Sequence, residues 1–575
     1  MCIRDRKAKV MIKQISGSQM ISEALHEEGV EIVFGYPGGA ALNIYDETYK
    51  QTYFKHVLVR HEQAAVHAAD GYARVSGKVG VAFVTSGPGF TNAVTGLATA
   101  YSDSIPVVLI SGQVPTFMIG TDAFQEIDAV GISRPCVKHN FLVNSVEELP
   151  RIIKEAFYIA RSGRPGPVHI DIPKNVTSRL GDFVYPKEIS IPSYKPTYKG
   201  NSKQIKKAAA AINEAKRPLL YIGGGAVASN ASEIIRKFMK KTGIPAVETL
   251  MALGVLDAKD KLNLGMAGMH GSYASNMALS ECDLLISLGA RFCDRVTGRT
   301  DEFAKHAKII HIDIDPSSIS KIINAHYPIV GDLTNVLSEL YEEVKGEPKN
   351  YAPWREILDR YQKLNPLGYT DSDKVLKPQW VVEETAKIVG PEAIIATDVG
   401  QHQMWVAQFY PFNRPRQLVT SGGLGTMGYG LPAAIGAKCA KPEHLVVNFT
   451  GDGSILMNIQ ELMTAYETNV PVINIILNNN FLGMVRQWQT FFYEKRYSST
   501  DLSLQPDFVK IAEGFGGVGF VCKSKDEFKK ALKEAIKSKK SALIDVRIDR
   551  FEDVLPMVPA GAAIYNMILK SKEEK

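Results

Sequence analysis

The sequence is poor in several features that mark specialised classes of protein. Its 575 residues include six cysteines and no C-x-x-C pair, which argues against a structural zinc site and favours a reduced, cytoplasmic setting. No uninterrupted apolar run approaches the ~18 residues of a membrane span, so no membrane partner is expected. The 67 basic and 61 acidic residues leave a net charge of +6, a small and dispersed excess that does not indicate binding to nucleic acid.

What remains is the composition of an ordinary globular protein. The chain is 45% hydrophobic and 22% charged, and it is long enough for roughly three or four domains. Residues 1–10 are charged and carry no apolar segment of the secretory type. Because Met11 gives a more ordinary start, we expect residues 1–10 to be an artefact of the recorded reading frame.

Three blocks of alternating apolar strands and helical stretches follow one another along the chain. They span residues 11–185, 203–345 and 378–550, with polar, proline-containing stretches between them and a tail over residues 551–575. Alternation of strands and helices predicts parallel sheets with helices on both faces. The predicted fold is therefore α/β, with three doubly wound parallel-sheet domains.

The third block contains the most specific pattern in the chain. Gly451-Asp452-Gly453 ends one apolar run, and Asn478-Asn479-Asn480 ends the next. Apolar residues from Ile455 to Tyr466 recur at helical spacing, which predicts one crossover helix between two parallel strands.

Asp452 and Asn479 are therefore expected at the carboxyl ends of neighbouring strands, where open α/β sheets bind ligands. A carboxylate and an amide oxygen suit Mg²⁺, which also takes diphosphate oxygens. The glycines on either side of Asp452 let the backbone approach a phosphate without a Cβ clash. The whole pattern resembles the binding motif for thiamine diphosphate (ThDP).

The first and third blocks share identical residues in register. With a shift of 365 positions (446 minus 81), nine residues between Val81 and Ile110 meet identical residues between Val446 and Ile475. Shared α/β composition is one explanation, and an ancient duplication is the other. The acidic Gly-Asp-Gly turn occurs only in the third block, so we expect that block to bind the diphosphate and the first block to serve another part of the cofactor.

Glu62 is the candidate acid of the first block. ThDP chemistry requires a proton to leave C2 of the thiazolium ring, and a carboxylate hydrogen-bonded to N1′ of the pyrimidine assists that step. Glu62 follows the apolar run 57–59 and opens an alanine-rich helix. Taken alone, an acid in the first turn of a helix more often interacts with the helix dipole. Together with the Gly-Asp-Gly motif, the same position favours a catalytic role.

Two further features of the third block suit the same cofactor. Met427 lies in the glycine-rich stretch 422–430, where it could hold the two cofactor rings in a bent, near-attack geometry; ordinary loop packing is the alternative. Gln401 and His402 follow the strand expected over residues 393–397, where they can meet the diphosphate. A single histidine after a strand is otherwise more often structural.

The middle block indicates a second cofactor. Gly223-Gly224-Gly225 directly follows the apolar run 219–222, and a glycine turn from strand to helix can cradle a phosphate. This signal is weak by itself because it is not a full G-x-G-x-x-G pattern. Asp313 and Asp332 follow later strands, at positions where ribose or adenine contacts occur. Together these features suggest an adenine-containing cofactor.

Nearly the whole chain from Met11 resembles the catalytic (large) subunits of the acetolactate synthase family. The segments that carry the resemblance are Arg60–Ala65, Gly112–Pro115, Ile119–Gln125, Arg291–Gly298, Gly425–Gly428, Leu482–Trp488 and Pro556–Pro559. The resemblance implies a transferase that decarboxylates pyruvate on ThDP and condenses the hydroxyethyl carbanion with pyruvate or 2-oxobutyrate. The products, 2-acetolactate and 2-aceto-2-hydroxybutyrate, start the biosynthesis of the branched-chain amino acids.

The resemblance also implies site residues. The catalytic set is Glu62, Met427, Gln125, Lys174, Arg295 and Trp488. The ThDP set is Pro37, Glu62, Gln401, His402, Gly425, Met427, Gly451, Asp452, Gly453, Ser454, Asn479 and Met484. The Mg²⁺ ligands are Asp452, Asn479 and the backbone oxygen of Phe481. The FAD set is Arg164, Gly223, Gly224, Gly225, Thr249, Leu250, Met269, His270, Gly289, Arg291, Asp294, Arg295, Asp313, Ile314 and Asp332.

Some of these residues have more specific implied roles. Arg295 is suited to pair with the carboxylate of the second oxo acid, because a guanidinium makes that contact bidentate, and Trp488 bears on the choice of that substrate. Pro115 and Phe124 line the same active-site channel as Gln125, Lys174 and Trp488. FAD is a structural or residual cofactor, since the net reaction is not a redox reaction. Cys293 departs from the family pattern, where an acid is common, and this puts one local FAD contact in doubt.

The resemblance further implies an assembly. Each active site combines Glu62 of one subunit with Asp452 of another, so a homodimer or a higher homo-oligomer is expected. A small regulatory subunit is the implied additional partner.

Three other functions fit parts of the sequence. An FAD-using pyruvate oxidase shares the architecture, although residues 291–298 and Trp488 favour the carboligase. A catabolic, FAD-independent acetolactate synthase is disfavoured by Arg291, Asp294 and Arg295. A non-catalytic nucleotide-binding protein would leave the pairing of Glu62 with Asp452 unexplained.

Overall fold

The computed structural model describes residues 13–345 and 351–571, so the expectation about residues 1–10 lies outside the described part. The described residues form three six-stranded sheets in which all neighbouring strands are parallel. A separate two-stranded antiparallel sheet joins β1 (Lys13–Ser16) to β8 (Leu180–Phe183). The predicted α/β class with three parallel sheets is confirmed. The chain divides into two compact units.

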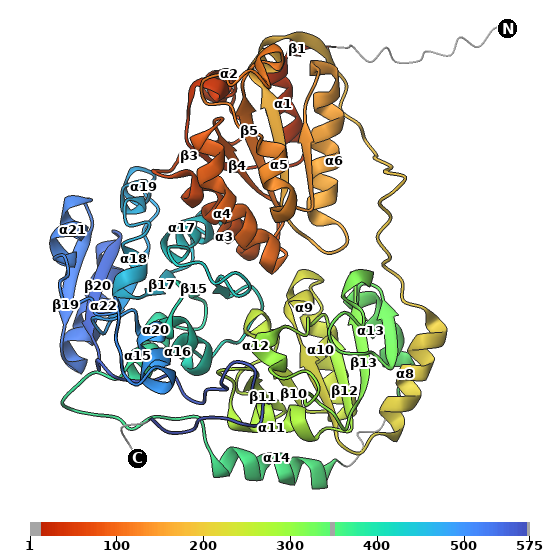
Figure 1. Ribbon diagram of the computed structural model, residues 1–575, viewed down its shortest axis with the longest axis vertical. Helices are drawn as coiled ribbons and strands as arrows, with labels where there is room; N and C mark the ends of the chain where they lie inside the picture. The colour runs from red at the N-terminus through yellow and green to blue at the C-terminus, as the bar shows by residue number, and fades with distance from the viewer. Residues whose placement is uncertain (1–12, 346–350, 572–575) are drawn as a thin grey trace. The chain divides into compact units, whose positions relative to one another are not determined.

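The first compact unit contains residues 13–70, 79–162 and 166–194 and has one six-stranded sheet. The strand order is β3-β2-β4-β5-β7-β6, and β3, β4 and β5 are labelled in Figure 1. The strands are β2 (Ile32–Gly35), β3 (Lys55–Leu58), β4 (Gly80–Val84), β5 (Val107–Gln113), β6 (His139–Leu142) and β7 (Val168–Pro173). The helices are α1 (Gly17–Glu27), α2 (Leu42–Lys50), α3 (Glu62–Ser76), α4 (Pro88–Asp103), α5 (Ala129–Ser133), α6 (Leu149–Arg161) and α7 (Lys174–Ser178).

The second compact unit contains residues 71–78, 163–165 and 195–571 and holds the other two sheets. The strands of its first sheet are β9 (Pro218–Ile222), β10 (Ala246–Glu248), β11 (Asn263–Met266), β12 (Leu284–Leu288), β13 (Lys308–Asp313) and β14 (Tyr327–Val330). Its helices are α8 (Ser202–Glu214), α9 (Gly224–Ala228), α10 (Ser232–Thr242), α11 (Tyr273–Glu281), α12 (Asp294–Thr297) and α13 (Leu333–Glu343). The sheet order is β11-β10-β9-β12-β13-β14, which is the order of dinucleotide-binding folds, with its reversal point between β9 and β12.

The C-terminal sheet has the order β16-β15-β17-β18-β20-β19. Its strands are β15 (Ile394–Thr397), β16 (Leu418–Val419), β17 (Val446–Thr450), β18 (Ile473–Asn478), β19 (Val518–Cys522) and β20 (Ala542–Arg547). The helices of this part are α14 (Ala352–Leu364), α15 (Pro378–Val389), α16 (Gln401–Phe409), α17 (Gly430–Ala440), α18 (Asp452–Ile455), α19 (Glu461–Glu467), α20 (Gly483–Phe492), α21 (Phe508–Gly514) and α22 (Lys525–Ser538).

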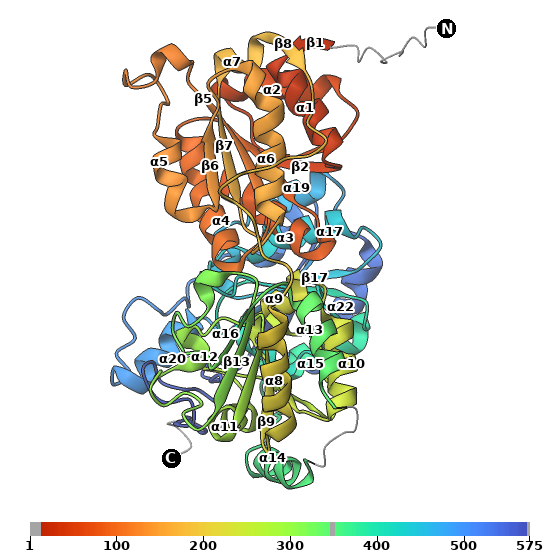
Figure 2. The ribbon, with the colours of Figure 1, turned by 90° about the vertical axis from the view of Figure 1, so that its right-hand side faces the viewer.

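Both faces of the C-terminal sheet are packed, as a doubly wound fold requires (Figures 1 and 2). On β18, Ile475 belongs to the apolar core that includes α15 and α16. Ile476, the next residue, belongs to the core on the other face, with α17. Because successive side chains of a strand point to opposite faces, a continuous apolar run was the correct signal for a strand that is buried on both sides.

The first and the C-terminal sheets have the same topology. Numbered along the chain within each sheet, the spatial order of the strands is the same, with β4 and β17 third and β5 and β18 fourth. These are the strands that the shift of 365 positions aligns. The agreement supports the interpretation of an ancient duplication.

The prediction of one continuous crossover helix between β17 and β18 is wrong. The segment instead forms two short helices, α18 and α19, with residues 456–460 between them. The side chain of Asn458 in this break donates a hydrogen bond to the backbone oxygen of Gly428, at 2.7 Å. This contact with the glycine-rich loop competes with a regular helix, and the periodicity of the apolar residues does not report it.

The C-terminal tail is folded onto the second unit over residues 551–571. Val558 and Ile564 are buried in the core of the β9–β14 sheet, and Met557 pairs through its backbone with Ile568. Among the described residues, no helix is long and apolar enough to cross a lipid bilayer.

Candidate active site

Asp452 and Asn479 occupy the predicted place in the C-terminal sheet. The strands that precede them, β17 and β18, are paired neighbours, with Thr450 opposite Ile476. Both side chains are buried, with exposed fractions of 2% for Asp452 and 5% for Asn479. The carboxylate and the amide therefore lie at one edge of the sheet, at the carboxyl ends of two adjacent parallel strands.

The electrostatics of Asp452 suit a bound cation. Burial raises its pKa to about 7, because removal from water disfavours the charged carboxylate. Gln505 donates a hydrogen bond to Asp452 from its side-chain amide. A divalent cation beside this carboxylate would reverse the effect of burial and favour the charged form. The donor set, a carboxylate and an amide oxygen, is one that Mg²⁺ prefers.

A histidine ring beside the Gly-Asp-Gly turn has a buried nitrogen that could bind a diphosphate. His402 packs so closely on Gly451 that a Cβ there would stand 3.0 Å from Nδ1. Nε2 of His402 is buried and has no hydrogen-bond partner among the described residues, and burial lowers the pKa of the ring to about 3. A phosphate oxygen next to Nε2 would supply the missing partner and favour the protonated ring.

Gln401 also begins helix α16, directly after the Gly400 cap. Its side-chain amide is engaged by other protein groups. The backbone N–H at the start of α16 is therefore the part of Gln401 that suits the predicted diphosphate contact.

Asp398 is a buried residue near this site to which the sequence analysis gave no role. Its carboxylate accepts hydrogen bonds from the backbone N–H of Gly428, at 2.8 Å, and of Val399, at 3.0 Å. Burial raises its pKa to about 6. Asp398 thus holds the glycine-rich loop against the end of β15. The signal in the sequence was an acid placed directly after a strand and two positions before a glycine.

Met427 lies on this loop, next to the Gly-Asp-Gly turn. A Cβ added to Gly453 would lie 4.0 Å from Cε of Met427. Gly425 and Gly428 on either side have φ angles of +72° and +84°, a left-handed conformation that glycine adopts without strain. Ser454 donates a hydrogen bond to the backbone oxygen of Val399, at 3.2 Å. The predicted ThDP residues of the third block are therefore brought together around Asp452.

Helix α20 carries two other predicted residues, Met484 and Trp488, which are both half-buried. The ring of Trp488 lies 5.1 Å from that of Phe492. The helix is attached to the C-terminal tail by a buried ion pair between Arg486 and Asp553, at 2.9 Å. Both charges are buried, and each compensates the other. Burial of either charge without its partner would be costly.

The glycine run of the middle block lies at the reversal point of its sheet, between β9 and β12. Gly225 donates a backbone hydrogen bond to Gly289, at 3.0 Å, and Gly223 donates one to Leu288, at 3.1 Å. A Cβ on Gly225 would stand 2.8 Å from Cα of Gly289. The glycines therefore let the loops after β9 and β12 touch, at the crevice where such sheets bind nucleotides.

The other predicted FAD residues of this sheet follow the carboxyl ends of its strands. After β10 come Thr249 and Leu250, after β11 Met269 and His270, after β12 Arg291, after β13 Ile314, and after β14 Asp332, while Asp313 is the last residue of β13. Burial raises the pKa of Asp313 to about 6, whereas Asp332 caps helix α13 through Asn335, at 3.1 Å. The edge location fits a dinucleotide, and Asp332 has a structural task as well.

Two arginines complete this edge. Arg164 groups with the second unit and forms an ion pair with Asp315, at 3.3 Å. Arg295 pairs with Asp294, at 3.2 Å, and its side chain is 57% exposed. Arg295 also lies beside Met269, with 3.3 Å from Nη1 to Sδ. The guanidinium of Arg295 is thus exposed to solvent and lies beside the predicted flavin residues, where a ligand carboxylate could reach it.

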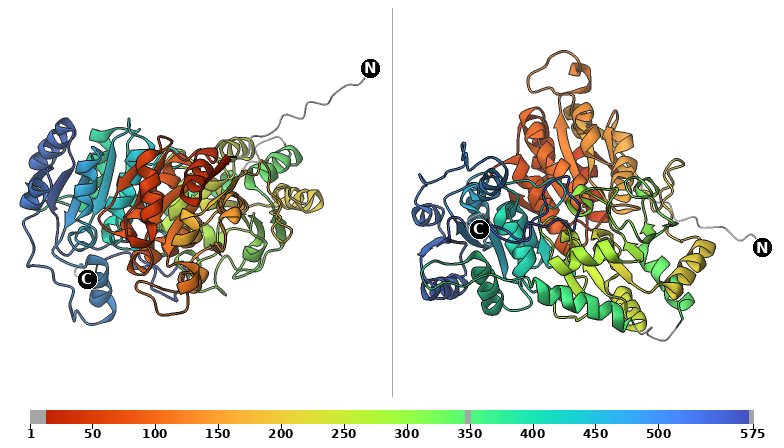
Figure 3. Two further views of the ribbon diagram at one scale, coloured as in Figure 1. Left: turned by 90° about the horizontal axis from the view of Figure 1, so that it is seen from above. Right: turned by 60° about the horizontal axis from the view of Figure 1, so that its bottom comes forward.

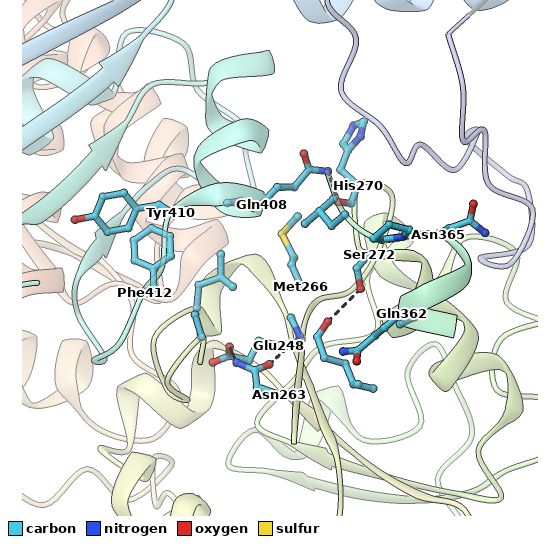
Figure 4. Close-up of a pocket in the computed structure, with 18 residues that line it drawn as sticks. Glu248, Asn263, Met266, His270, Ser272, Gln362, Asn365, Gln408, Tyr410 and Phe412 are labelled. Carbon is cyan, nitrogen blue, oxygen red and sulfur yellow. Dashed lines mark hydrogen bonds between the residues drawn. The ribbon is translucent and has the colours of Figure 1, made fainter. Parts of the chain in front are cut away.

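A pocket of about 350 Å³ opens beside this edge (Figure 4). Among its lining residues are Glu248, His270, Gln408 and Phe412. His270 belongs to the predicted FAD set, and none of the lining residues belongs to the Asp452 motif. The oxygens of Glu248 accept hydrogen bonds from the backbone of Leu256 and the side chain of Asn263, both at 3.0 Å. The pocket is therefore separate from the thiamine motif.

In the first unit, the predicted residues again follow the carboxyl ends of parallel strands. Pro37 comes after β2, Glu62 after β3, Gln125 after β5 and Lys174 after β7. Glu62 begins α3, as predicted, and accepts a hydrogen bond from the side-chain amide of Asn92 on α4, at 3.0 Å. The sequence analysis did not identify Asn92 as a partner of Glu62, because the two residues are 30 positions apart and no motif connects them.

The loop that carries Gln125 projects between β5 and α5 (Figures 2 and 3). Phe117 and Phe124 on this loop are 77% and 87% exposed. Its far end is tied to the sheet by Gln113, whose amide donates to the backbone oxygen of Ile127 and to Asp171, both at 2.9 Å. Two large exposed rings on a tethered loop are typical of a surface that another group covers.

Asp171 makes the anchor of this loop sensitive to pH. Burial raises its pKa from 3.8 to about 7, so the folded state holds this proton more tightly than the unfolded chain. The stabilisation is complete below pH ~4 and is lost as the pH rises through about 7. Asp171→Asn cannot ionise and can still bond Gln113 and Ser111. We expect it to raise the free energy of unfolding at pH 8 by roughly 1–4 kcal/mol.

Denaturant titrations of both proteins at pH 5 and pH 8 measure this effect, with the exposed Asp182→Asn as the control. A variant whose advantage over the parent is equal at the two pH values would contradict the assignment.

With this geometry in place, comparison with known proteins identifies the class. Three family models match the chain: the thiamine pyrophosphate enzyme N-terminal TPP binding domain over residues 15–132, the central domain over 205–340 and the C-terminal TPP binding domain over 398–546. The chain belongs to the thiamine pyrophosphate enzymes.

Individual relatives identify a more specific family within this class. The acetolactate synthase large subunit of Haemophilus influenzae is 48% identical over 571 residues, which cover 98% of this chain and 100% of the relative. The isozyme 3 large subunit of Escherichia coli is 46% identical over 573 residues, 98% of this chain and 100% of the relative. The probable large subunit of Methanocaldococcus jannaschii is 49% identical over 564 residues, 96% of this chain and 95% of the relative. The chain belongs to the acetolactate synthase large-subunit family, and that prediction is confirmed.

Proposed function

We propose that the protein joins two 2-oxo acids with loss of CO₂. It would convert two molecules of pyruvate to 2-acetolactate, and pyruvate with 2-oxobutyrate to 2-aceto-2-hydroxybutyrate, at the start of branched-chain amino-acid synthesis. The observation that carries the proposal is the buried pair of Asp452 and Asn479 at adjacent strand ends, in a chain that matches acetolactate synthase large subunits over nearly its full length.

Asp452, Asn479 and the backbone oxygen of Phe481 would hold Mg²⁺, and the metal would hold the diphosphate of ThDP. His402 and the N–H groups at the start of α16 would bind the diphosphate oxygens. When bound, ThDP supplies the acidic carbon and the electron sink of the reaction. The task of the protein is to hold this group, to orient it and to manage one proton.

Glu62 would hold that proton at N1′ of the pyrimidine. The amide of Asn92 donates to one oxygen of Glu62, which leaves the other oxygen for the cofactor. A Cβ on Gly89 would lie 3.4 Å from that second oxygen, so a glycine keeps its approach open. Met427 would hold the rings in the bent form from its place beside Gly453.

The acceptor oxo acid would meet four of the predicted site residues. Arg295 would pair with its carboxylate through two parallel hydrogen bonds. Trp488 would limit the size of its alkyl group, and Gln125 and Lys174 would line the channel that leads to it. FAD would bind along the carboxyl edge of the β9–β14 sheet as a structural group.

The unit of function would be at least a homodimer, in which Glu62 of one subunit completes the Asp452 site of another. Glu62 and Asp452 belong to different compact units of the chain. A small regulatory subunit is the further partner that we propose, because relatives are named as large subunits.

A product assay tests the reaction. Purified protein with pyruvate, ThDP, Mg²⁺ and FAD is expected to form acetolactate without uptake of oxygen, and the purified protein is expected to carry a flavin. Acetyl phosphate with peroxide would instead identify a pyruvate oxidase. Acetolactate formed at full rate by a flavin-free preparation would identify the catabolic type.

A further inference from the structure

The amide of Asn479 is held in one orientation by a neighbouring amide. Nδ2 of Asn479 donates to Oε1 of Gln401, at 3.1 Å, and both side chains are at most 5% exposed. With the nitrogen turned toward Gln401, Oδ1 of Asn479 faces the other way, where it accepts from the backbone N–H of Phe481, at 3.1 Å. A carbonyl oxygen has two lone pairs, so Oδ1 retains one for a cation.

The orientation of Gln401 is set in turn by two acceptor oxygens, one from a side-chain amide and one from the backbone. Its Nε2 donates to Oε1 of Gln487, at 2.8 Å, and to the backbone oxygen of Glu552, at 3.1 Å. Gln487 is fully buried and pairs with the backbone of Val554 at both ends of its amide, accepting at 2.9 Å and donating at 3.0 Å. A side-chain amide can rotate by 180°, but a peptide group in a folded chain cannot.

The orientation of all three side-chain amides is therefore set by the backbone of the C-terminal tail. The N–H of Val554 requires the oxygen of Gln487 on its side, and that oxygen requires the nitrogen of Gln401. The oxygen of Gln401 then requires the nitrogen of Asn479. If any amide were reversed, two N–H groups or two oxygens would face each other in a buried site, which is costly.

The close packing of these groups depends on a glycine. A Cβ on Gly483 would stand 2.2 Å from Oε1 of Gln401 and 2.8 Å from Nδ2 of Asn479. Any side chain at this first position of α20 would push the two amides apart. The glycine in this segment is therefore explained by the hydrogen bond between Gln401 and Asn479, and not by its own backbone angle.

We propose that Gln401 and Gln487 are positioning residues that orient Oδ1 of Asn479 toward Mg²⁺. Their own orientation is set by the backbone of residues 552–554. The proposal rests on the proposed metal site and adds to it. It assigns a task to Gln487 and to the tail, and it gives the side chain of Gln401 a partner other than the diphosphate. Groups that orient a metal ligand typically contribute 10–100-fold to metal affinity.

Binding of ThDP, measured by titration calorimetry over a range of Mg²⁺ concentrations and without substrate, tests the proposal. Gln401→Met and Gln487→Met keep the length of the side chain and remove its hydrogen bonds. We expect each to raise the Mg²⁺ concentration that half-saturates ThDP binding by roughly 10–100-fold. The turnover number at saturating Mg²⁺ should change much less than this.

Gln417→Met is the matched control. Gln417 is also fully buried and makes three hydrogen bonds, to backbone groups of Pro391, Ala393 and Asn413, but it does not touch the amide chain. It should lower the stability of the fold to a similar degree and leave the Mg²⁺ dependence unchanged. All binding is expressed per folded protein, with the folded fraction taken from circular dichroism.

Two results would overturn the proposal: an unchanged Mg²⁺ dependence in Gln401→Met and Gln487→Met, or an equal shift in Gln417→Met. Failure of the unaltered protein to bind ThDP with Mg²⁺ is a separate outcome, which would overturn the metal site itself and this inference with it.

Discussion

Glu62→Gln is expected to lower kcat by roughly 10²–10⁴-fold, the range that a positioned proton-transfer group contributes. Glutamine keeps the size of the side chain and its contact with Asn92, but it cannot exchange a proton with N1′ of the pyrimidine. Binding of ThDP and Mg²⁺ should change little, because the metal motif lies in the other unit of the chain.

Steady-state assays with pyruvate, together with ThDP titrations, measure the two effects separately. Glu147→Gln is the matched control, since Glu147 is an exposed acid in the first turn of a short helix. Undiminished turnover in Glu62→Gln would mean that activation at N1′ has another source. Loss of ThDP binding would mean that Glu62 holds the cofactor and does not activate it.

Asp452→Asn is expected to weaken Mg²⁺-dependent binding of ThDP by about a hundredfold or more, because it removes the one carboxylate of the proposed metal site. The loss of activity should follow the loss of binding, and a high concentration of Mg²⁺ with ThDP should restore part of both. Asparagine fills the same space and can present its own carbonyl oxygen to the side-chain amide of Gln505, so the fold should survive.

Calorimetric titration with ThDP over a series of Mg²⁺ concentrations measures this loss. Asp526→Asn, which alters an exposed acid in the first turn of α22, serves as the control. Binding of ThDP to Asp452→Asn at the parental Mg²⁺ concentration would remove Asp452 from the metal site.

The parts of the site that could be predicted are those that local chemistry marks. Gly451-Asp452-Gly453 ends an apolar run. Because such a run predicts a buried parallel strand, the end of the run marks the carboxyl edge of the sheet, where ligands bind. Glu62 could be found in the same way, as an acid between a strand and an alanine-rich helix. The sequence could predict that the β9–β14 sheet is parallel and covered on both faces, because its strands are continuous apolar runs.

The parts that could not be predicted depend on contacts between distant residues. Asn92 reaches Glu62 from another helix, and Gln487 meets Gln401 across 86 positions of sequence. The break between α18 and α19 coincides with the hydrogen bond from Asn458 to Gly428. The spacing of apolar residues contains no information about this contact. The sequence marked the glycines at 223–225 as a candidate phosphate cradle, but it could not show that Gly223 and Gly225 also contact the loop after β12.

The central claim is that one active site is built from Glu62 of one subunit and Asp452 of another. Mixing Glu62→Gln with Asp452→Asn, after dissociation and reassembly, tests it most directly. Hybrid dimers would contain one intact site and one doubly altered site, so the account predicts recovery to about a quarter of the parental activity, since half of the dimers are hybrids. A mixture that stays as inactive as its two components, although hybrids have formed, would contradict the account and place Glu62 and Asp452 of a single chain in one site.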